Sequence, residues 1–396
     1  MNFDEEIDRR AVPALKWHGM VLGEGNEHIF PAGVADMDFR APDSVRAAMQ
    51  ARLDHGVFGY ETVQPDLMPA LCDWMEGRHG WDIDPGHILR APNILNALAI
   101  AASIFTEPGD AVIVQPPVFF DFFDILNENH REIVENPLVL RDGRYVMDFD
   151  DLEAKTARRD VKMIYLCNPH NPMGRVWTRE ELTRLGDICA ENGVIVVSDE
   201  MHGDLVLPGR EAYVPFAALG EAYAQNSITC LSPAKTFNIA SCSSAFTVVP
   251  DAAWRKAFQV ENSRLTVNKN NGFANVAMVA AWREGGEWLD AVLVYLDQNL
   301  ALMRERISEM NGVGMIEPEA GFLAWVDFRE LGLAPKALTA LLKGKAGWAP
   351  TRGEAFGPGG EGFARVNFAC RRKTLAAALD RLEAALAAAH LSLAKP

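Results

Sequence analysis

The sequence predicts an α/β protein with a mostly parallel sheet in its larger part and a smaller α+β part at its end. The middle of the chain alternates short apolar runs with segments of helical periodicity. These runs lack the polar alternation of a half-exposed strand, so helices should cover both faces of the sheet. The last third instead combines one long helical pattern with isolated strand patterns.

The apolar runs, which are rich in valine and isoleucine, give the strands of the larger part. They cover residues 111–115, 162–167, 194–197, 227–231 and 245–249. Because each run is short and mostly apolar, we expect the strands to lie in the interior of one sheet.

Two helices of this part have recognisable starts. Thr178 stands where an N-cap is expected, and the helix after it should run to about Glu191, before Asn192-Gly193. A second helical pattern, from Ala97 to about residue 105, follows Pro92 and Asn93.

In the last third, a long helix is predicted from Trp288 to about Met310, and strands are predicted at 321–328 and 363–368. Four leucines then recur at helical spacing, which predicts an amphipathic C-terminal helix packed by that face. They are Leu375, Leu379, Leu382 and Leu386.

The length of 396 residues is sufficient for two domains. We expect a large domain over residues 46–289 and a small domain made of residues 1–45 and 290–396. No low-complexity linker separates them, so the two domains should touch closely.

Composition limits the class of partner. The charged and hydrophobic contents, 23% and 49%, are ordinary for a soluble globular protein. A net charge of -16 argues against nucleic acid, which needs a basic surface. The acidic start MNFDEE does not resemble a secretory signal, and no apolar stretch approaches ~18 residues. We therefore expect a cytoplasmic protein with no membrane segment, no nucleic-acid partner and six reduced cysteines.

The most informative stretch is SPAKTFN, over residues 232–238. A lone lysine means little, but Lys235 follows an apolar strand and stands downstream of two polar signatures. These are CNPHNPMGR over residues 167–175 and VVSDEMH over residues 196–202. Together the three stretches predict a site for pyridoxal 5′-phosphate (PLP).

In such a site Lys235 would form a Schiff base with the cofactor's aldehyde. Asp199 would pair with the pyridine nitrogen, and Asn171 would hydrogen-bond the ring oxygen. A PLP enzyme needs a lysine and an acidic pyridinium partner because the ring must act as an electron sink.

The acid and the amide also have plainer explanations. Asp199 could be a helix cap or a loop acceptor, but it ends a buried strand, where ligands bind in open α/β sheets. Asn171 lies in a loop, where asparagine and proline are common. The prolines on either side of it would nevertheless hold the loop rigid. The cofactor site is favoured because Asp199 and Asn171 occur together with Lys235.

Two features would bind the cofactor phosphate. Ser232 can donate its hydroxyl, and the backbone N–H groups of Ile94 and Leu95 at a helix start would hold a dianion. Many helices begin after Pro and Asn, so the helix start alone is not specific. The patterns H-E-x-x-H and G-x-S-x-G are absent, so the sequence does not support a metal site or a serine hydrolase.

These motifs resemble those of the aspartate-aminotransferase fold (fold type I) of the aminotransferase class I/II superfamily. More closely, the chain is similar to the cystathionine β-lyase-type C–S lyases. The resemblance runs from VADMDF at 34–39 to RVNFAC at 365–370. It implies a large domain with a mostly parallel seven-stranded sheet, together with a smaller α+β domain.

The resemblance also implies roles for further residues. His202 would contact the ring hydroxyl beside Asn171, and Phe119 would stack on the ring. Arg365 would clamp the α-carboxylate of the substrate, a task that suits a guanidinium fork. Tyr60 would reach the phosphate of the neighbouring subunit and is a candidate to accept the proton of the substrate amine, which implies a homodimer with shared sites.

The sequence departs from the pattern of the relatives in three places. Phe119 stands where they usually carry tyrosine, so it can stack but offers no hydroxyl. Ala234 replaces the usual serine before the lysine. The stretch SCSS at 241–244 replaces a Gly-Leu type continuation.

We therefore expect a PLP-dependent C–S β-lyase that cleaves cystathionine or a related cysteine S-conjugate to pyruvate, ammonia and a thiol. An aminotransferase acting on an amino acid and a keto acid is the enzymatic alternative. A PLP-binding regulatory protein that interacts with a transcription factor is the alternative from another class, although no feature of the sequence favours it.

Overall fold

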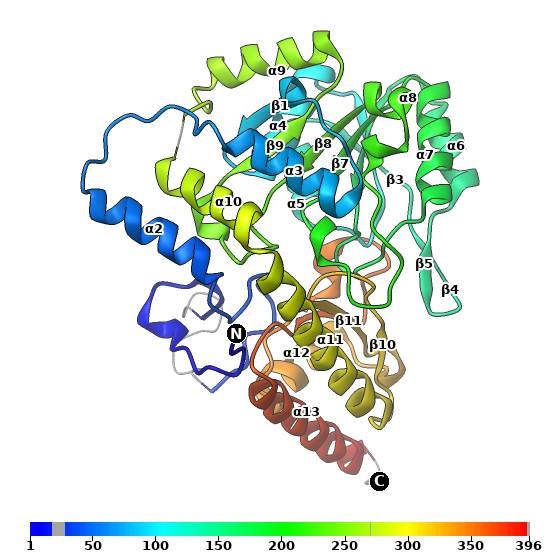
Figure 1. Ribbon diagram of the computed structural model, residues 1–396. Coiled ribbons are helices and arrows are strands. Elements are labelled where there is room, and N and C mark those ends of the chain that lie inside the picture. The colour runs from blue at the N-terminus through cyan, green and yellow to red at the C-terminus, as the bar shows by residue number, and fades with distance from the viewer. Residues whose placement is uncertain (18–27, 270, 394–396) are drawn as a thin grey trace.

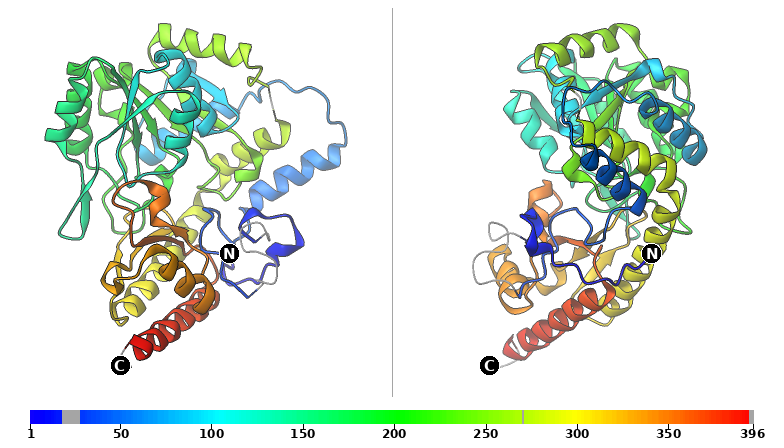
Figure 2. Two further views of the ribbon diagram at one scale, coloured as in Figure 1. Left: turned by 180° about the vertical axis from the view of Figure 1, so that it is seen from behind. Right: turned by 60° about the vertical axis from the view of Figure 1, so that its left-hand side comes forward.

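The computed structural model of the chain describes residues 1–17, 28–269 and 271–393. It contains a seven-stranded sheet, a four-stranded sheet and a two-stranded hairpin. Figure 1 shows the seven-stranded sheet in the upper half of the view and the four-stranded sheet in the lower half. Figure 2 shows the same separation from behind.

The seven-stranded sheet is mixed but mostly parallel. In spatial order its strands are β1 (Ile88–Ala91), β9 (Ala245–Val248), β8 (Ser227–Leu231), β7 (Ile195–Asp199), β6 (Val161–Cys167), β2 (Ala111–Val114) and β3 (Glu132–Glu135). Strand β9 pairs antiparallel with both of its neighbours, whereas β8, β7, β6, β2 and β3 pair in parallel. The predicted mostly parallel sheet of seven strands is confirmed.

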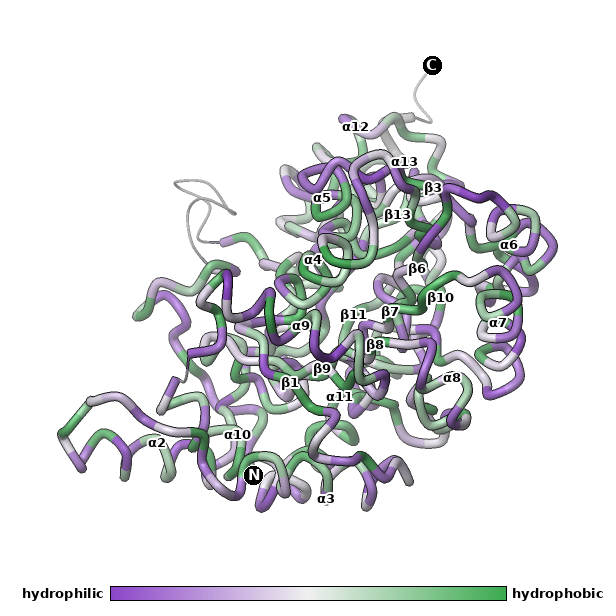
Figure 3. The backbone as a smooth tube through the Cα atoms, turned by 90° about the horizontal axis from the view of Figure 1, so that it is seen from above, coloured by the Kyte–Doolittle hydropathy of each residue, from purple (hydrophilic) through white to green (hydrophobic). Residues whose placement is uncertain are grey.

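Both faces of this sheet are buried, as the unbroken apolar runs predict. In β2, Ala111 and Ile113 belong to one hydrophobic core, and Val112 and Val114 belong to another on the opposite face. The helices that complete these cores are α6 (Phe149–Thr156) and α7 (Arg179–Glu191) on the first face, and α4 (Ile94–Phe105) and α9 (Ala252–Arg264) on the second. In Figure 3 the outer helices α6 and α7 alternate between hydrophilic and hydrophobic colours, as helices with one solvent face do.

The start of α7 is confirmed. Thr178 Oγ1 accepts a 3.2 Å hydrogen bond from the amide of Glu181, and the Glu181 carboxylate accepts a 2.8 Å bond from the Thr178 amide. This reciprocal capping box satisfies two of the free donors at the helix start. Helix α4 begins at Ile94, three residues earlier than predicted, because the Asn93 side chain caps the helix at that point.

The smaller sheet is antiparallel throughout. Its strands in spatial order are β10 (Gly314–Ile316), β11 (Leu323–Asp327), β13 (Phe363–Asn367) and β12 (Thr351–Arg352). The long helix α11 (Gly286–Ser308) and the terminal helix α13 (Arg372–Leu393) accompany it. The four leucines predicted to pack α13 are all buried, so that amphipathic face is confirmed.

The N-terminal segment joins the smaller sheet from the other end of the chain. The amide of Phe30 donates to the carbonyl of Gly347 at 2.7 Å, and the amide of Asn367 donates to the carbonyl of Ala32 at 2.7 Å. Residues 317 positions apart in the first pair and 335 in the second therefore lie side by side. Helix α11 crosses the expected boundary at residues 289 and 290, and the exact division into domains stays a prediction.

The other α-helices and strands are α2 (Asp43–His55), α3 (Leu67–His79), α5 (Asp121–Glu128), α8 (Glu221–Gln225), α10 (Gly272–Glu284), α12 (Pro335–Thr339) and the hairpin of β4 (Val139–Arg141) with β5 (Arg144–Val146).

None of the helices within the described ranges is long and apolar enough to cross a bilayer. All six cysteines are free thiols, as predicted.

Candidate active site

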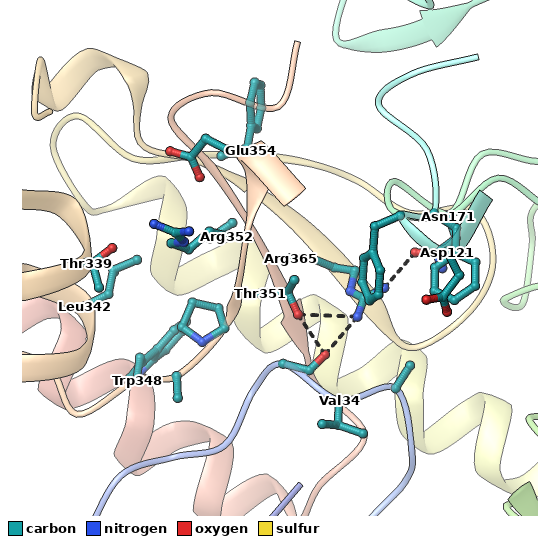
Figure 4. Close-up of a pocket in the computed structure, with 18 of the residues that line it drawn as sticks. Val34, Asp121, Asn171, Thr339, Leu342, Trp348, Thr351, Arg352, Glu354 and Arg365 are labelled. Atoms are coloured by element: carbon teal, nitrogen blue, oxygen red, sulfur yellow. Dashed lines mark hydrogen bonds between the residues drawn. The ribbon is translucent and has the colours of Figure 1, made fainter. Parts of the chain in front are cut away.

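A cavity of about 600 Å³ opens between the seven-stranded sheet and the smaller sheet (Figure 4). This volume is typical of sites for small molecules and cofactors. Six of the residues predicted from the sequence line it: Phe119, Asn171, Asp199, His202, Lys235 and Arg365.

The parallel strands explain why four of these residues meet. Phe119, Asn171, Asp199 and Lys235 lie at or just after the carboxyl ends of β2, β6, β7 and β8. These four strands are consecutive neighbours in the sheet. Because parallel strands end at the same edge, side chains that are far apart in the sequence converge there.

Asp199 supplies a buried carboxylate at this edge. Its Oδ1 accepts a 3.1 Å hydrogen bond from the amide of Met201. Burial raises its pKa to about 6, against the favourable effects of that hydrogen bond and of the Lys235 charge. The group is therefore mostly ionised at neutral pH and can hold a positive charge placed beside it.

The ammonium group of Lys235 donates a hydrogen bond to the backbone carbonyl of Ala35. Burial, together with the nearby charge of Arg365, lowers the pKa of Lys235 to about 8. Among the described residues, no carboxylate forms an ion pair with this lysine. Lys235 is therefore uncharged near neutral pH more often than an ordinary lysine, and the uncharged form is the one that acts as a nucleophile or a base.

Arg365, on β13, presents a buried guanidinium to the cavity. Its Nη1 donates to Oδ1 of Asn171 at 3.0 Å, and its Nη2 donates to the carbonyl of Gly33 at 2.9 Å. Its Nε has no hydrogen-bond partner, and no carboxylate of the described chain lies within ion-pair distance. Burial lowers the pKa of Arg365 to about 10. A buried cation in this state is matched by an incoming carboxylate.

His202 and Asn171 add polar groups without charge. Burial, together with the charges of Lys235 and Arg365, lowers the pKa of His202 to about 3, so the imidazole is neutral. The Oδ1 atom of Asn171 is occupied by Arg365, which leaves the amide nitrogen of Asn171 as the donor for a ligand.

The predicted phosphate-binding residues do not line this cavity. The Ser232 hydroxyl donates to the carbonyl of Ser244 at 2.8 Å and accepts from the amide of Ala234 at 3.2 Å. Ile94 and Leu95 are the first two residues of α4, where backbone amides lack an acceptor within the helix. Their contacts with a phosphate stay a prediction.

Tyr60 also lies away from the cavity. It is fully exposed in the segment between α2 and α3, and Val57 and Phe58 of the same segment are exposed as well. The guanidinium of Arg52 lies 5.2 Å from the ring centre of Phe58. Any contact of Tyr60 with a cofactor would therefore have to be made in a second subunit, and its predicted role stays untested.

The structure adds residues that the sequence did not indicate. Asp121, the first residue of α5, lines the cavity, and its pKa is raised by burial and by the charge of Asp124. In the sequence, the one hint that Asp121 belongs to the site is its place two residues after Phe119. Trp348, Arg352 and Glu354 line the cavity from the smaller sheet and the loops around it, and no motif marks them.

The donor set of the cavity fits PLP. Lys235 has a lowered pKa suited to bonding an aldehyde, and Asp199 has a charge that complements a protonated ring nitrogen. Asn171 offers an amide donor, and Phe119 offers an aromatic face. Among the described residues, the Asp199 carboxylate accepts a hydrogen bond from the Met201 amide alone, so no other polar group has to be displaced for it to accept such a nitrogen.

Comparisons with known proteins agree with this geometry. The family profile described as Aminotransferase class I and II matches residues 29–382. The protein "Cystathionine beta-lyase PatB" of Bacillus subtilis (strain 168) is 43% identical over 389 residues, which cover 98% of this chain and 100% of that protein.

Solved structures of PLP-containing proteins match this chain over nearly its full length. Cystalysin from Treponema denticola, which contains PLP, superposes with a TM-score of 0.94 at 31% identity and covers 98% of this chain and 99% of its own. The PLP-bound C–S lyase from Staphylococcus hominis gives a TM-score of 0.90 at 30% identity, with 98% and 99% covered. The predicted fold is confirmed, and the chain belongs to the class I and II aminotransferase family, whose cofactor is PLP.

Proposed function

We propose that this protein is a PLP-dependent C–S β-lyase that cleaves cystathionine or a related cysteine S-conjugate to a thiol, pyruvate and ammonia. The observation that carries the proposal is that Lys235, Asp199 and Arg365 line one cavity in a chain 43% identical to a cystathionine β-lyase. Cystalysin and the C–S lyase of Staphylococcus hominis share its fold over nearly the full length.

Arg365 holds the substrate by its α-carboxylate. The guanidinium is buried, lacks a carboxylate partner in the described chain and has one unused N–H at Nε. A substrate carboxylate supplies the missing negative charge and can form two parallel hydrogen bonds with the fork. This contact fixes Cα and its proton relative to Lys235.

Lys235 moves the proton. PLP, when bound, supplies an electron sink for the electron pair left at Cα. With a pKa of about 8, the Lys235 Nζ atom can accept the Cα proton and can return a proton to the departing sulfur.

Asp199 supports the same step from the opposite end of the cofactor. Its carboxylate, ionised above about pH 6, stabilises positive charge at the ring nitrogen. Fixed charge of this kind, aimed at the place where charge develops, is among the largest contributions to catalysis.

The overall reaction consumes one water. The Cβ–S bond breaks, the sulfur leaves as a thiol, and hydrolysis of the remaining three-carbon unit gives pyruvate and ammonia. No oxidant or acceptor molecule is needed, which separates this reaction from amino transfer.

The functional unit is proposed to be a homodimer. The exposed segment that carries Val57, Phe58 and Tyr60 provides apolar surface for a second copy and would bring Tyr60 to the neighbouring cavity. Sedimentation of the holoenzyme tests the assembly, and the kinetics of a Tyr60→Phe variant test the use of the hydroxyl. We also propose that the protein works in the cytoplasm.

Amino transfer is the second candidate, because the family profile is that of aminotransferases and because Phe119 lacks a hydroxyl that could take part in elimination. Incubation of the holoenzyme with cystathionine and no keto acid decides between the two. Steady release of pyruvate and a thiol supports the lyase, whereas turnover that requires an added keto acid supports the aminotransferase.

A further inference from the structure

The cavity continues beyond the reaction centre into a part lined by charged side chains. These are Lys343, in the helical turn after α12, together with Arg352 and Glu354 at and after β12. The residue before Arg352 is Thr351, which lies directly opposite Arg365 in the sheet register. Arg352 therefore stands one residue along the chain from Thr351, the residue that pairs with Arg365 in the sheet.

The three side chains are available for a ligand. No hydrogen bond or ion pair joins Lys343, Arg352 or Glu354 to another side chain in the part of the chain that the structure describes. The exposed Arg329, by contrast, is paired with Asp327 at 2.7 Å. Arg352 thus brings an uncommitted guanidinium into the same cavity as Arg365.

Arg352 and Glu354 lie on the side of Arg365 that faces away from the proposed cofactor site (Figure 4). In the view of Figure 4, Asn171 and Asp121 lie on one side of Arg365, and Arg352 and Glu354 lie on the other. The wall beside Arg352 is apolar and is formed by buried residues that also line the cavity. These residues are Leu338, Leu342 and Trp348.

We propose that Arg352, Lys343 and Glu354 form a second subsite that binds the charged far end of the substituent carried on the substrate sulfur. The inference rests on the proposed function, in which Arg365 holds the α-carboxylate of the cysteine half. Two cations and one carboxylate match a carboxylate that is accompanied by an ammonium group. The chemical class is therefore a thioether between cysteine and a second amino acid.

The chemistry of each residue gives it a distinct part. Arg352 binds the distal carboxylate, because a guanidinium can form two parallel hydrogen bonds with it, and Lys343 adds a point charge. Glu354 accepts from the distal ammonium group. The apolar wall of Leu342 and Trp348 packs against the methylene groups and the sulfur in between.

The test compares three substrates that differ only at the far end. Cystathionine carries a distal carboxylate and a distal ammonium, S-(3-carboxypropyl)cysteine carries the carboxylate alone, and S-propylcysteine carries neither. Pyruvate release by the holoenzyme gives kcat/KM for each, and the values are expressed as ratios to S-propylcysteine. The same ratios are measured for Arg352→Ala, Glu354→Gln and, as a control, Arg141→Ala, an exposed arginine on the β4–β5 hairpin outside the cavity.

We expect Arg352→Ala to lower the ratios for cystathionine and for S-(3-carboxypropyl)cysteine by about tenfold, the loss expected for one charged hydrogen-bonded contact. Glu354→Gln should lower only the ratio for cystathionine, and Arg141→Ala should change neither. Ratios that stay at the wild-type values in Arg352→Ala would overturn the subsite. An equal fall for all three substrates would also overturn it, because the residue would then have only a structural effect.

A failure of the lyase reaction gives a different result. If the wild-type holoenzyme releases no pyruvate from any of the three compounds, the proposed function is wrong. The same compounds can then be titrated into that holoenzyme and into Arg352→Ala by calorimetry. A preference of the wild type for the carboxylate-bearing compounds that is lost in the variant supports the subsite, and equal binding of all three overturns it.

Discussion

The Nη1 atom of Arg365 donates a 3.0 Å hydrogen bond to Oδ1 of Asn171, across 194 positions of sequence and between the two sheets. The group proposed to hold the substrate carboxylate is thus tied to the side chain proposed to contact the cofactor ring. Loss of either residue should disturb the other, because the bond orients both side chains in a buried site.

Lys235→Ala should abolish turnover, with a loss of at least about 10³-fold, while the fold is retained, because no other amine in the cavity has a comparable position. Borohydride reduction of the wild type should fix PLP to Lys235, as peptide mass mapping can show. Lys256→Ala, an exposed lysine on α9, is the matched control and should keep full activity. A reduced label on any other lysine would contradict the assignment.

Asp199→Asn should lower kcat by about 10²-fold or more, since a lost electrostatic contact in a catalytic site is worth roughly 3 kcal/mol. The adjacent Glu200 is an internal comparison, because it is equally buried but does not line the cavity. Glu200→Gln should change kcat much less than it changes thermal stability. Near-normal kcat in Asp199→Asn would remove Asp199 from the mechanism.

Arg365→Lys should raise KM for the amino-acid substrate by about tenfold or more, while PLP occupancy stays close to that of the wild type. Lysine keeps the charge but cannot form the two-pronged contact with a carboxylate. Steady-state kinetics and the absorbance of the bound cofactor measure the two effects separately. A fall in occupancy at unchanged KM would place the carboxylate contact elsewhere.

Phe119→Tyr should preserve stacking, because the ring is the same size, and should raise β-elimination or shift its pH optimum. The added hydroxyl would lie beside the cavity that contains Lys235 and could exchange a proton with the substrate amine. The measurement is the pH profile of kcat/KM for both proteins. Identical rates and identical profiles would mean that position 119 serves only as a stacking surface.

The buried Glu200 should make folding stability depend on pH. Burial raises its pKa from 4.5 to about 7, although Ser198, Tyr213 and the Phe216 amide all donate to it. A raised pKa in the folded state means that its stabilising contribution is complete below pH 4.5 and is lost as the pH rises to about 7.

The change should be on the order of 3 kcal/mol. It is measured as the difference in the free energy of unfolding between wild type and Glu200→Gln in urea at several pH values. The wild type should lose stability relative to the variant between pH 4.5 and 7. A difference that does not vary with pH would show that Glu200 does not titrate in this range.

The sequence alone determined the elements whose signals are local. The strand at 227–231 and the helix after Thr178 lie where they were predicted, because apolar runs and capping boxes act over a few residues. Four site residues could be grouped in advance for a related reason. Phe119, Asn171, Asp199 and Lys235 each follow an apolar run, and parallel strands end at a common edge.

Tertiary structure decided what depends on contacts between distant segments. The hydroxyl of Ser232 is engaged by Ser244, and Tyr60 projects from the surface, neither of which a local pattern could reveal. Arg352 lies in the cavity only because β12 pairs with β13 and sets Thr351 opposite Arg365. A sequence shows which side chains are charged, but packing decides whether each charge has a partner. In the described chain, packing leaves Arg352 and Arg365 without carboxylate partners.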